Sequence, residues 1–472
     1  MAWEPREPSG TSGPWGRRIR IGRGGEAYRP GQLIVPTEQY EANPELFRAL
    51  GDVTAEVGSY THITGAFDAA HEIAQLRDEG LQASHNHVLF ATGHDCGCGH
   101  ASAPCPPHPS TPGASDYYDS LRAQMDPGSD WHRCGGSAAN PFYANPFYAN
   151  PFYANPFYAN PFYANPFYAN AEPNPALSPS GAGGRRRTSA RPALQPETSR
   201  ALPEEPMADP GDIRIAIVDT GYAIDDPIAP NGIMANATIT GPRHDIPTDD
   251  GDGYYDPAAG HGTFIAGIIE QHAPGCQIEV VDVLSTYGDG DEATIAQALL
   301  GLVESNVSFV NLSFSGYSHN GIPALEEAIA ALRAVGTVVV ASAGNDATCR
   351  APFPAVIDGV IAVGALTEDG LPAQFTNYGP WVDASAHGVD VESAFFRWDG
   401  GEEPCCGQDP DNFEGGARWS GTSFSAPRVV GELARHMVVE GGTGEDAAAA
   451  LITGGGERIP MLGTVVGFDE NA

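Results

Sequence analysis

One serine in the C-terminal half of the chain lies in a setting that suits nucleophilic chemistry. Ser423 belongs to the stretch RWSGTSFSAP, in which small residues lead into the apolar positions of a predicted helix. Glycine and serine also gather in turns, and a hydroxyl before an apolar run often caps a helix. Ser423 is therefore interpreted as a nucleophile only if a base, an acid and an oxyanion donor lie elsewhere in suitable positions.

The chain contains a candidate acid, a candidate oxyanion donor and a candidate base. Asp219 closes IRIAIVD, Asn345 ends VVVASAGN, and His261 stands between two glycines at the start of the predicted helix GHGTFIAGIIE. The Asp219-Thr220-Gly221 triplet also occurs in aspartic proteases, but that chemistry needs a second such carboxylate, and the chain has no other DTG. An aspartate such as Asp219, taken by itself, is more often only a helix cap or a turn former.

Together the four residues predict a complete mechanism. Ser423 attacks a carbonyl carbon and His261 accepts its proton, while Asp219 orients the imidazole. The amide of Asn345 stabilises the oxyanion, and the start of the helix at Ser423 favours developing negative charge. The order Asp, His, Ser along the chain is one of the orders known for this triad.

The elements that carry these residues predict an α/β fold with a doubly wound parallel sheet. From residue 211 to residue 472, short runs rich in Val and Ile alternate with helical patterns at 292–306 and 323–336. Continuous apolar strands indicate a sheet that is covered on both faces, and chemistry gathers at the carboxyl ends of such strands. The predicted strands are residues 213–219, 277–284, 307–313, 336–343 and 359–365.

Four segments of this region resemble the signature segments of the subtilisin-like serine proteases. They are IAIVDTG, GHGTFIAG, VVVASAGN and SGTSFSAP, and the resemblance covers about residues 211–455. It implies a serine endopeptidase that hydrolyses protein or peptide substrates through an acyl-enzyme, with no cofactor for the chemistry. The resemblance also implies a substrate groove whose edge is formed by Ser313, Phe314, Ser315, Gly316 and Gly344.

The chain departs from the family pattern near these segments. Ser315 stands where glycine is usual, and Phe264 and Phe424 stand where His and Met are common. Arg428 replaces a usual histidine. An insert between residues 390 and 420 precedes the nucleophile, and we expect it to shape access to the site.

Residues 27–92 predict a small α+β domain. The expected elements are a strand at 31–36, helices at 44–53 and 67–80, and a closing strand at 86–91. The stretch LRDEGLQASHNHVLFA resembles the last helix and strand of the inhibitory propeptides of subtilisin-like proteases. We therefore expect an intramolecular inhibitory domain and a zymogen. Residues 1–26 are predicted to be a disordered N-terminus.

Residues 93–210 are a low-complexity linker in composition. The unit NPFYA recurs in tandem over residues 140–169, and its regular prolines exclude a continuous helix or a central strand. A turn-rich spacer is the favoured interpretation, and an aromatic array that binds a partner is the alternative.

Two stretches offer metal-ligating side chains. The acidic loop DIPTDDGDGYYD suits a structural calcium ion or a solvated loop, and its spacing matches no EF-hand. A second stretch with Cys-x-Cys spacing suits zinc or a thiol-bearing linker. The calcium candidates are Asp249, Asp250, Asp252 and Asp256, with Asp245 in the same loop, and the zinc candidates are Cys96, Cys98, His100 and Cys105.

Composition limits the classes of partner. Acidic residues outnumber basic ones by 60 to 24, for a formal charge of −36, which disfavours nucleic acid because phosphate binding needs a basic surface. The sequence contains no apolar stretch long enough for a membrane span and no secretory signal, so we expect a cytoplasmic protein. In that compartment its eight cysteines would be thiols or metal ligands.

Two alternatives to simple hydrolysis remain open at this point. A transpeptidase or peptide-maturation protease would pass the acyl-enzyme to an amine in place of water. A binding scaffold with a vestigial protease domain would use the aromatic repeats and the Cys/His segment instead.

Overall fold

The structure of this chain is a computed structural model that describes most of its two predicted folded regions. The described residues are 19–21, 26–91, 202, 206–223, 234, 237–241, 245–246, 256, 258–399 and 412–467. The NPFYA repeats and the four zinc candidates lie outside these residues, as do Asp249, Asp250 and Asp252. The predictions made for them stay predictions.

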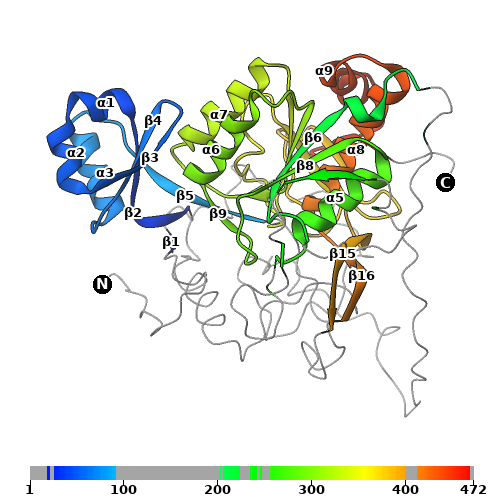
Figure 1. Cartoon of the computed structure of the whole chain (residues 1–472), viewed down its shortest axis with the longest axis horizontal. Helices are drawn as coiled ribbons and strands as arrows, with labels where there is room; N and C mark the ends of the chain where they lie inside the picture. Colours follow the sequence, from blue (N-terminus) through cyan, green and yellow to red (C-terminus); the bar gives the residue numbers. More distant parts are fainter. Residues whose placement is uncertain are drawn as a thin grey trace, which may run out of the picture.

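A nine-stranded sheet forms the centre of the C-terminal region (Figure 1). Its strands, in order across the sheet, are β17 (Arg458–Ile459), β18 (Gly463–Val465), β14 (Ala384–His387), β13 (Ile361–Leu366), β12 (Val338–Ser342), β10 (Phe309–Leu312), β6 (Arg214–Asp219), β8 (Gln277–Asp282) and β7 (Thr238–Thr240). All neighbouring strands are parallel except the pair β17–β18. This arrangement confirms the predicted parallel α/β sheet.

Helices cover both faces of this sheet, because the strand residues that point to each face are apolar. On β6, Ile217 belongs to the core formed with α5 (His261–His272) and α8 (Thr422–Glu440). Its neighbour Val218 belongs to the core on the opposite face. The helices on that face are α6 (Glu292–Leu302) and α7 (Pro323–Ala334). These two are the predicted helices, and both end a few residues early.

The remaining elements of the C-terminal region lie at its periphery. The insert before the nucleophile forms an antiparallel hairpin of β15 (Val391–Asp399) and β16 (Asn412–Trp419), which packs against α5. A short 3₁₀ helix precedes β6, and a short α-helix and a π-helix follow α8. Their bounds are η8 (Pro210–Asp212), α9 (Gly444–Ala448) and η9 (Ala449–Thr453).

The N-terminal region is a small α+β body with a core of its own. Its elements are β1 (Arg20–Ile21), β2 (Ala27–Pro36), α1 (Thr37–Ala42), α2 (Pro44–Leu50), β3 (Asp52–Val57), β4 (Tyr60–Thr64), α3 (Ala69–Asp78) and β5 (Ser84–Ala91). Leu33, Phe47 and Ile63 are fully buried in this core. The body is consistent with the predicted α+β domain.

One difference from the prediction is the hairpin of β3 and β4, whose first residues were expected to belong to the helix at 44–53. The helix ends at Leu50, and the next residue, Gly51, has extended backbone with φ 173° and lies against a neighbouring part of the chain. A Cβ at Gly51 would lie 2.2 Å from the carbonyl oxygen of Thr64. Gly58, with φ +56°, then makes the turn between β3 and β4.

The two bodies share a sheet. Strand β5 pairs antiparallel with β9 (Asp289–Asp291) on one side and with β11 (Phe314–Ser315) on the other. In Figure 1, β5 runs from the N-terminal body toward the C-terminal one, and α6 and α7 face the N-terminal body. The closing strand predicted at 86–91 therefore belongs to both bodies.

Two general features were also expected from composition. Within the described part of the chain, no helix has the length and apolarity that a membrane crossing requires. Cys276 is a buried free thiol, as expected, but Cys349 is disulfide-bonded. The expectation that all cysteines are thiols or metal ligands is therefore wrong for Cys349.

Candidate active site

Asp219 and His261 meet at the carboxyl edge of the sheet. Asp219 is the last residue of β6 and His261 is the first residue of α5, and both side chains are fully buried. The imidazole Nδ1 donates to Asp219 Oδ1 at 2.7 Å, and the backbone N–H of Thr220 donates to the same oxygen at 2.8 Å. The carboxylate thus fixes the ring orientation. Among the described residues, His261 Nε2 has no hydrogen-bond partner.

The turn before His261 requires glycine. Gly260 has φ +81°, in the left-handed region, and a Cβ there would lie 2.1 Å from the ring of Phe395. Phe395 comes from β15, so the hairpin packs directly on the start of α5. This local crowding explains why a glycine precedes the histidine.

Ser423 lies in the first turn of α8 and is fully buried. Its Oγ donates to the carbonyl oxygen of Ser313 at 3.0 Å, and Ser313 Oγ donates to the Ser423 carbonyl at 2.8 Å. This reciprocal pair holds the start of the helix against the residue that precedes β11. The serine hydroxyl therefore rests on the predicted substrate edge rather than on the imidazole.

Asn345 lies beside the same helix start. Its Oδ1 accepts from the N–H of Thr422 at 3.0 Å and from Thr422 Oγ1 at 2.8 Å. Because these bonds use the amide oxygen, they determine which end of the side chain carries the N–H donors. The adjacent Gly344 has φ +96°, and a Cβ there would lie 2.4 Å from Asn377 Nδ2.

Aromatic rings enclose the imidazole. Trp419, at the end of β16, lies 5.3 Å from the His261 ring centroid, and Phe424 lies 5.5 Å from it. The two rings also contact each other, with centroids 5.0 Å apart. The insert before the nucleophile therefore supplies part of the wall around His261.

Asp245 is a residue of this site that the sequence did not reveal. The sequence places Asp245 in an acidic loop, but its side chain is buried and accepts hydrogen bonds from four donors. Oδ1 accepts from Gly260 N at 2.6 Å and from Thr220 Oγ1 at 3.2 Å. Oδ2 accepts from Thr263 N at 3.2 Å and Thr263 Oγ1 at 2.6 Å. Asp245 therefore joins the segment after Asp219 to the first turn of α5.

Burial raises the pKa of Asp245 to about 7, although the hydrogen bonds from Thr263 and Gly260 act in the opposite direction. The negative charge of Asp219 also raises this pKa. The Asp245 carboxylate is the acceptor in all four hydrogen bonds, and this arrangement favours its ionised form. Asp245 thus holds Thr220 and Gly260, the residues next to Asp219 and His261, at a fixed separation.

The predicted substrate edge already carries a strand in this structure. Phe314 pairs with Ala91 and Ser315 pairs with Phe90, so β5 lies along the segment from Ser313 to Gly316. Across β5, Phe90 also pairs with Asp289 of β9. The strand thus occupies the space between β9 and β11 and ends beside Ser313.

The metal predictions gain no support from the one candidate that is described. The Asp256 carboxylate accepts a hydrogen bond from Thr286 Oγ1 at 2.6 Å. In the described part of the chain, no group of three or more His, Cys, Asp or Glu side chains is arranged to hold a metal ion. A structural calcium or zinc site stays a prediction.

The sequence is similar to several characterised proteases. It is 32% identical over 241 residues to the thermophilic serine proteinase of Bacillus sp. (strain AK1), covering 48% of this chain and 52% of that protein. It is 30% identical over 237 residues to the intracellular serine protease of Paenibacillus polymyxa, covering 47% of this chain and 65% of that protein. The chain thus matches between about half and two thirds of the length of these relatives.

The chain also matches solved structures, among them that of a cold adapted subtilisin-like serine proteinase. That match has a TM-score of 0.42 and 23% identity, and it covers 57% of this chain and 93% of the other. The prenylagaramide maturation protease PagA matches with a TM-score of 0.44 and 22% identity, covering 54% of this chain and 91% of the other.

A family match covers just over half of the chain. Residues 211–454 match the Subtilase family, Peptidase_S8. This range contains all four residues that the sequence selected for nucleophilic chemistry. The chain belongs to the subtilase family.

Proposed function

We propose that the protein is a serine endopeptidase in which Ser423, His261 and Asp219 act together. The Ser423 oxygen forms a bond to the carbonyl carbon of a peptide, and its proton passes to His261 Nε2. Asp219 holds Nδ1 and stabilises the imidazolium. His261 then gives the proton to the leaving amine, and water hydrolyses the acyl-enzyme in a second round with the same base.

The observation that carries this proposal is the buried Asp219–His261 hydrogen bond. With Nδ1 occupied at 2.7 Å by the carboxylate, Nε2 is the basic nitrogen and lacks a partner among the described residues. Such a nitrogen suits a general base that awaits a hydroxyl proton. The Ser423 hydroxyl would have to leave the Ser313 carbonyl and rotate toward Nε2, a change within the range expected of an unliganded site.

Asn345 and the first turn of α8 are proposed to stabilise the oxyanion. Donors held in place before the reaction stabilise charge that develops in the transition state. The Thr422 hydrogen bonds to Asn345 Oδ1 supply that rigidity, since they leave the amide little freedom to rotate. The helix start contributes a favourable dipole at Ser423.

Ser423→Ala is expected to lower kcat/KM by about 10⁴- to 10⁶-fold, because the attacking oxygen is lost. A fluorophosphonate probe should label the wild-type chain but not this variant. Ser425→Ala is the matched control, since Ser425 lies in the same helix turn and its hydroxyl donates to the Ala386 carbonyl at 3.0 Å. Substantial peptidase activity or labelling in Ser423→Ala would refute the mechanism.

We also propose that the N-terminal body restrains the active site. Ala91 N donates to the Gly288 carbonyl at 2.8 Å, and Ala91 pairs with Phe314, the neighbour of Ser313. A strand seated there would exclude substrates from the groove. The substrates would be proteins or peptides in extended conformation, which add a strand to an open edge.

A further inference from the structure

The face of β5 that looks into the groove carries a fixed pattern of side chains. His87, Leu89 and Ala91 alternate along the strand and therefore point to the same side. Leu89 is 1% exposed and belongs to the core that includes Phe314. His87 is 4% exposed. Residues 88–91 pair with β9 and β11, whereas His87 pairs with Tyr28 of β2 and lies one position before that segment. A chain that replaced β5 there would present its side chains to the same surroundings, with the residue at the place of His87 next to the start of α6.

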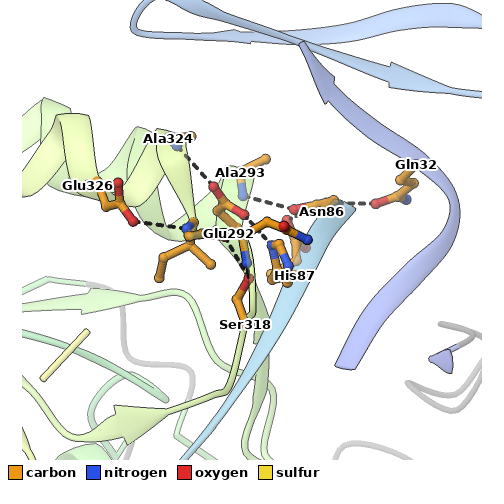
Figure 2. Close-up of polar contacts among 12 residues, drawn as sticks. Gln32, Asn86, His87, Glu292, Ala293, Ser318, Ala324 and Glu326 are labelled. Atoms are coloured by element: carbon orange, nitrogen blue, oxygen red, sulfur yellow. Dashed lines mark hydrogen bonds and ion pairs between the residues drawn. The ribbon is translucent and has the colours of Figure 1, made fainter. Parts of the chain in front are cut away.

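The surroundings of His87 contain a buried carboxylate, Glu292, at the start of α6. Figure 2 shows Glu292 between the two bodies, with contacts on both sides. Its Oε1 accepts from Ala324 N at 2.9 Å, and its Oε2 accepts from His87 Nδ1 at 2.9 Å. Glu292 is 0% exposed. A buried carboxylate is costly unless it is paired, so Oε2 needs a donor whenever the groove is filled.

The two contacts of Glu292 come from different parts of the chain. The bond from Ala324 belongs to the catalytic region itself, because Ala324 lies in the first turn of α7. The bond from His87 comes from the strand that fills the groove. A substrate strand would remove His87 and would have to supply its replacement.

Carboxylates next to Glu292 in the sequence also accept hydrogen bonds from the N-terminal body. Asp289 accepts from Arg29 Nη2 at 2.5 Å, and both side chains are buried. Asp291 Oδ1 accepts from Asn86 Nδ2 at 3.1 Å, while Ala293 N donates to Asn86 Oδ1 at 3.1 Å (Figure 2). The carboxylates of Asp289, Asp291 and Glu292 thus all accept hydrogen bonds from the N-terminal body.

We propose that Glu292 is a specificity-determining residue that selects a basic side chain in the substrate. The selected residue lies four positions before the substrate residue that takes the place of Ala91. Lys, Arg or protonated His supplies the donor, and an apolar residue takes the place of Leu89. The inference rests on the proposed endopeptidase function, because it concerns the same groove.

The test is a competition between two peptides in one reaction with the purified wild-type chain, incubated beforehand until its self-processing is complete. Both carry residues 84–95 of this sequence, one with His87→Lys and the other with norleucine at that position, which has a similar reach without the charge. With the two peptides at equal concentrations, the ratio of initial rates equals the ratio of kcat/KM, so partial blockage by the N-terminal body cancels. Because a hydrogen bond to a charged group is stronger than a neutral contact, the Lys peptide should be cut about ten- to a hundredfold faster.

Glu292→Gln and Glu326→Gln complete the experiment. The Glu292→Gln side chain would keep an acceptor for Ala324 N but lose the charge, so the ratio should fall below about threefold. Glu326 lies near the same helix starts, but its Oε1 accepts from Ile322 N, within the catalytic region, so Glu326→Gln should keep the preference. A His87→Glu peptide tests the wild-type chain without any variant, and it should be the poorest substrate.

The outcomes separate this inference from the proposed function. A general protein substrate in the same buffer reports whether the processed chain is a protease at all, and no digestion of it would remove both proposals. Digestion of the general substrate with equal cutting of the two peptides, or with no cutting of the Lys peptide, would overturn the subsite alone. Mass spectrometry must place the cut at the same bond in both peptides.

Discussion

At the scale of single residues, the Asn345 amide is the donor whose removal is easiest to interpret. Asn345→Leu keeps the approximate size of the side chain and deletes the N–H group. We expect kcat to fall by about a hundred- to a thousandfold with little change in KM, the size of effect that loss of one oxyanion donor has in a subtilisin. Steady-state kinetics on a peptide substrate measure both constants.

Asn320→Leu provides the control for this variant, because Asn320 is exposed and lies in the loop before α7. Its kcat should be unchanged. If Asn345→Leu also keeps its kcat, Asn345 has no part in stabilising the oxyanion.

The sequence identified residues whose chemistry is unusual for their local setting, and it missed those that depend on distant contacts. A histidine between two glycines and a serine at a helix start are visible in short windows. Asp245 was not, because an aspartate in an acidic, glycine-containing stretch is typical of a solvated loop. Its donors Gly260 and Thr263 lie 15 and 18 residues away.

At the scale of elements, Asp245 links the segment after β6 to the first turn of α5. Asp245→Asn replaces one acceptor oxygen by a donor, so it cannot accept from all four groups. We expect kcat/KM to fall by about ten- to a hundredfold at about pH 8, because a small displacement of α5 moves His261 relative to Ser423. Because this is an effect on positioning, kcat should fall more than KM rises.

Asp383→Asn is the matched control for this change. Asp383 is partly buried, its pKa is also raised by burial, and it accepts from Ala362 N at 2.9 Å, but it lies near β14 and β18. Both variants should unfold at similar temperatures. A loss of stability in Asp245→Asn with unchanged kinetics of the folded fraction would show a purely structural role.

Helices and strands could be predicted where their apolar pattern is local. The pairing of strands that lie far apart in the sequence could not be predicted. Strands such as β12, with the run VVVAS, are buried on both faces and could be read directly. Strand β5 also looked like a strand, but its partners β9 and β11 lie about two hundred residues further along the chain. No short-range pattern encodes that pairing. The sequence at the starts of α6 and α7 likewise does not indicate that these helices face the N-terminal body.

At the scale of the whole molecule, the proposed restraint predicts a difference in chain length between active and inactive protein. The wild-type chain is expected to be cut within residues 91–210, whereas Ser423→Ala should stay full length. Denaturing electrophoresis and mass spectrometry of both, purified in the same way, measure this difference. Cutting of Ser423→Ala at the same bond, in the absence of other proteases, would contradict self-processing.

The separated N-terminal domain should also inhibit the processed enzyme when added in trans. The domain has its own core around Leu33 and Phe47, which supports independent folding. Deleting residues 87–91 should weaken inhibition, because these residues form the pairs with β9 and β11. Equal activity with and without a large excess of the domain would leave residues 27–92 as a partner-binding module. The cytoplasmic location and the role of the linker stay predictions.

The placement of β5 between β9 and β11 also limits the physical state of anything that is cut. Paired strands lie about 4.8 Å apart, so departure of β5 leaves a slot roughly 10 Å wide with unpaired backbone groups on both walls. A helix with its side chains is about as wide as the slot and offers no free N–H or C=O groups to those walls. A segment that is helical in the target must therefore unfold before it can enter. Whether a folded protein is cut would then depend on local unfolding of the target segment, and not on its sequence alone.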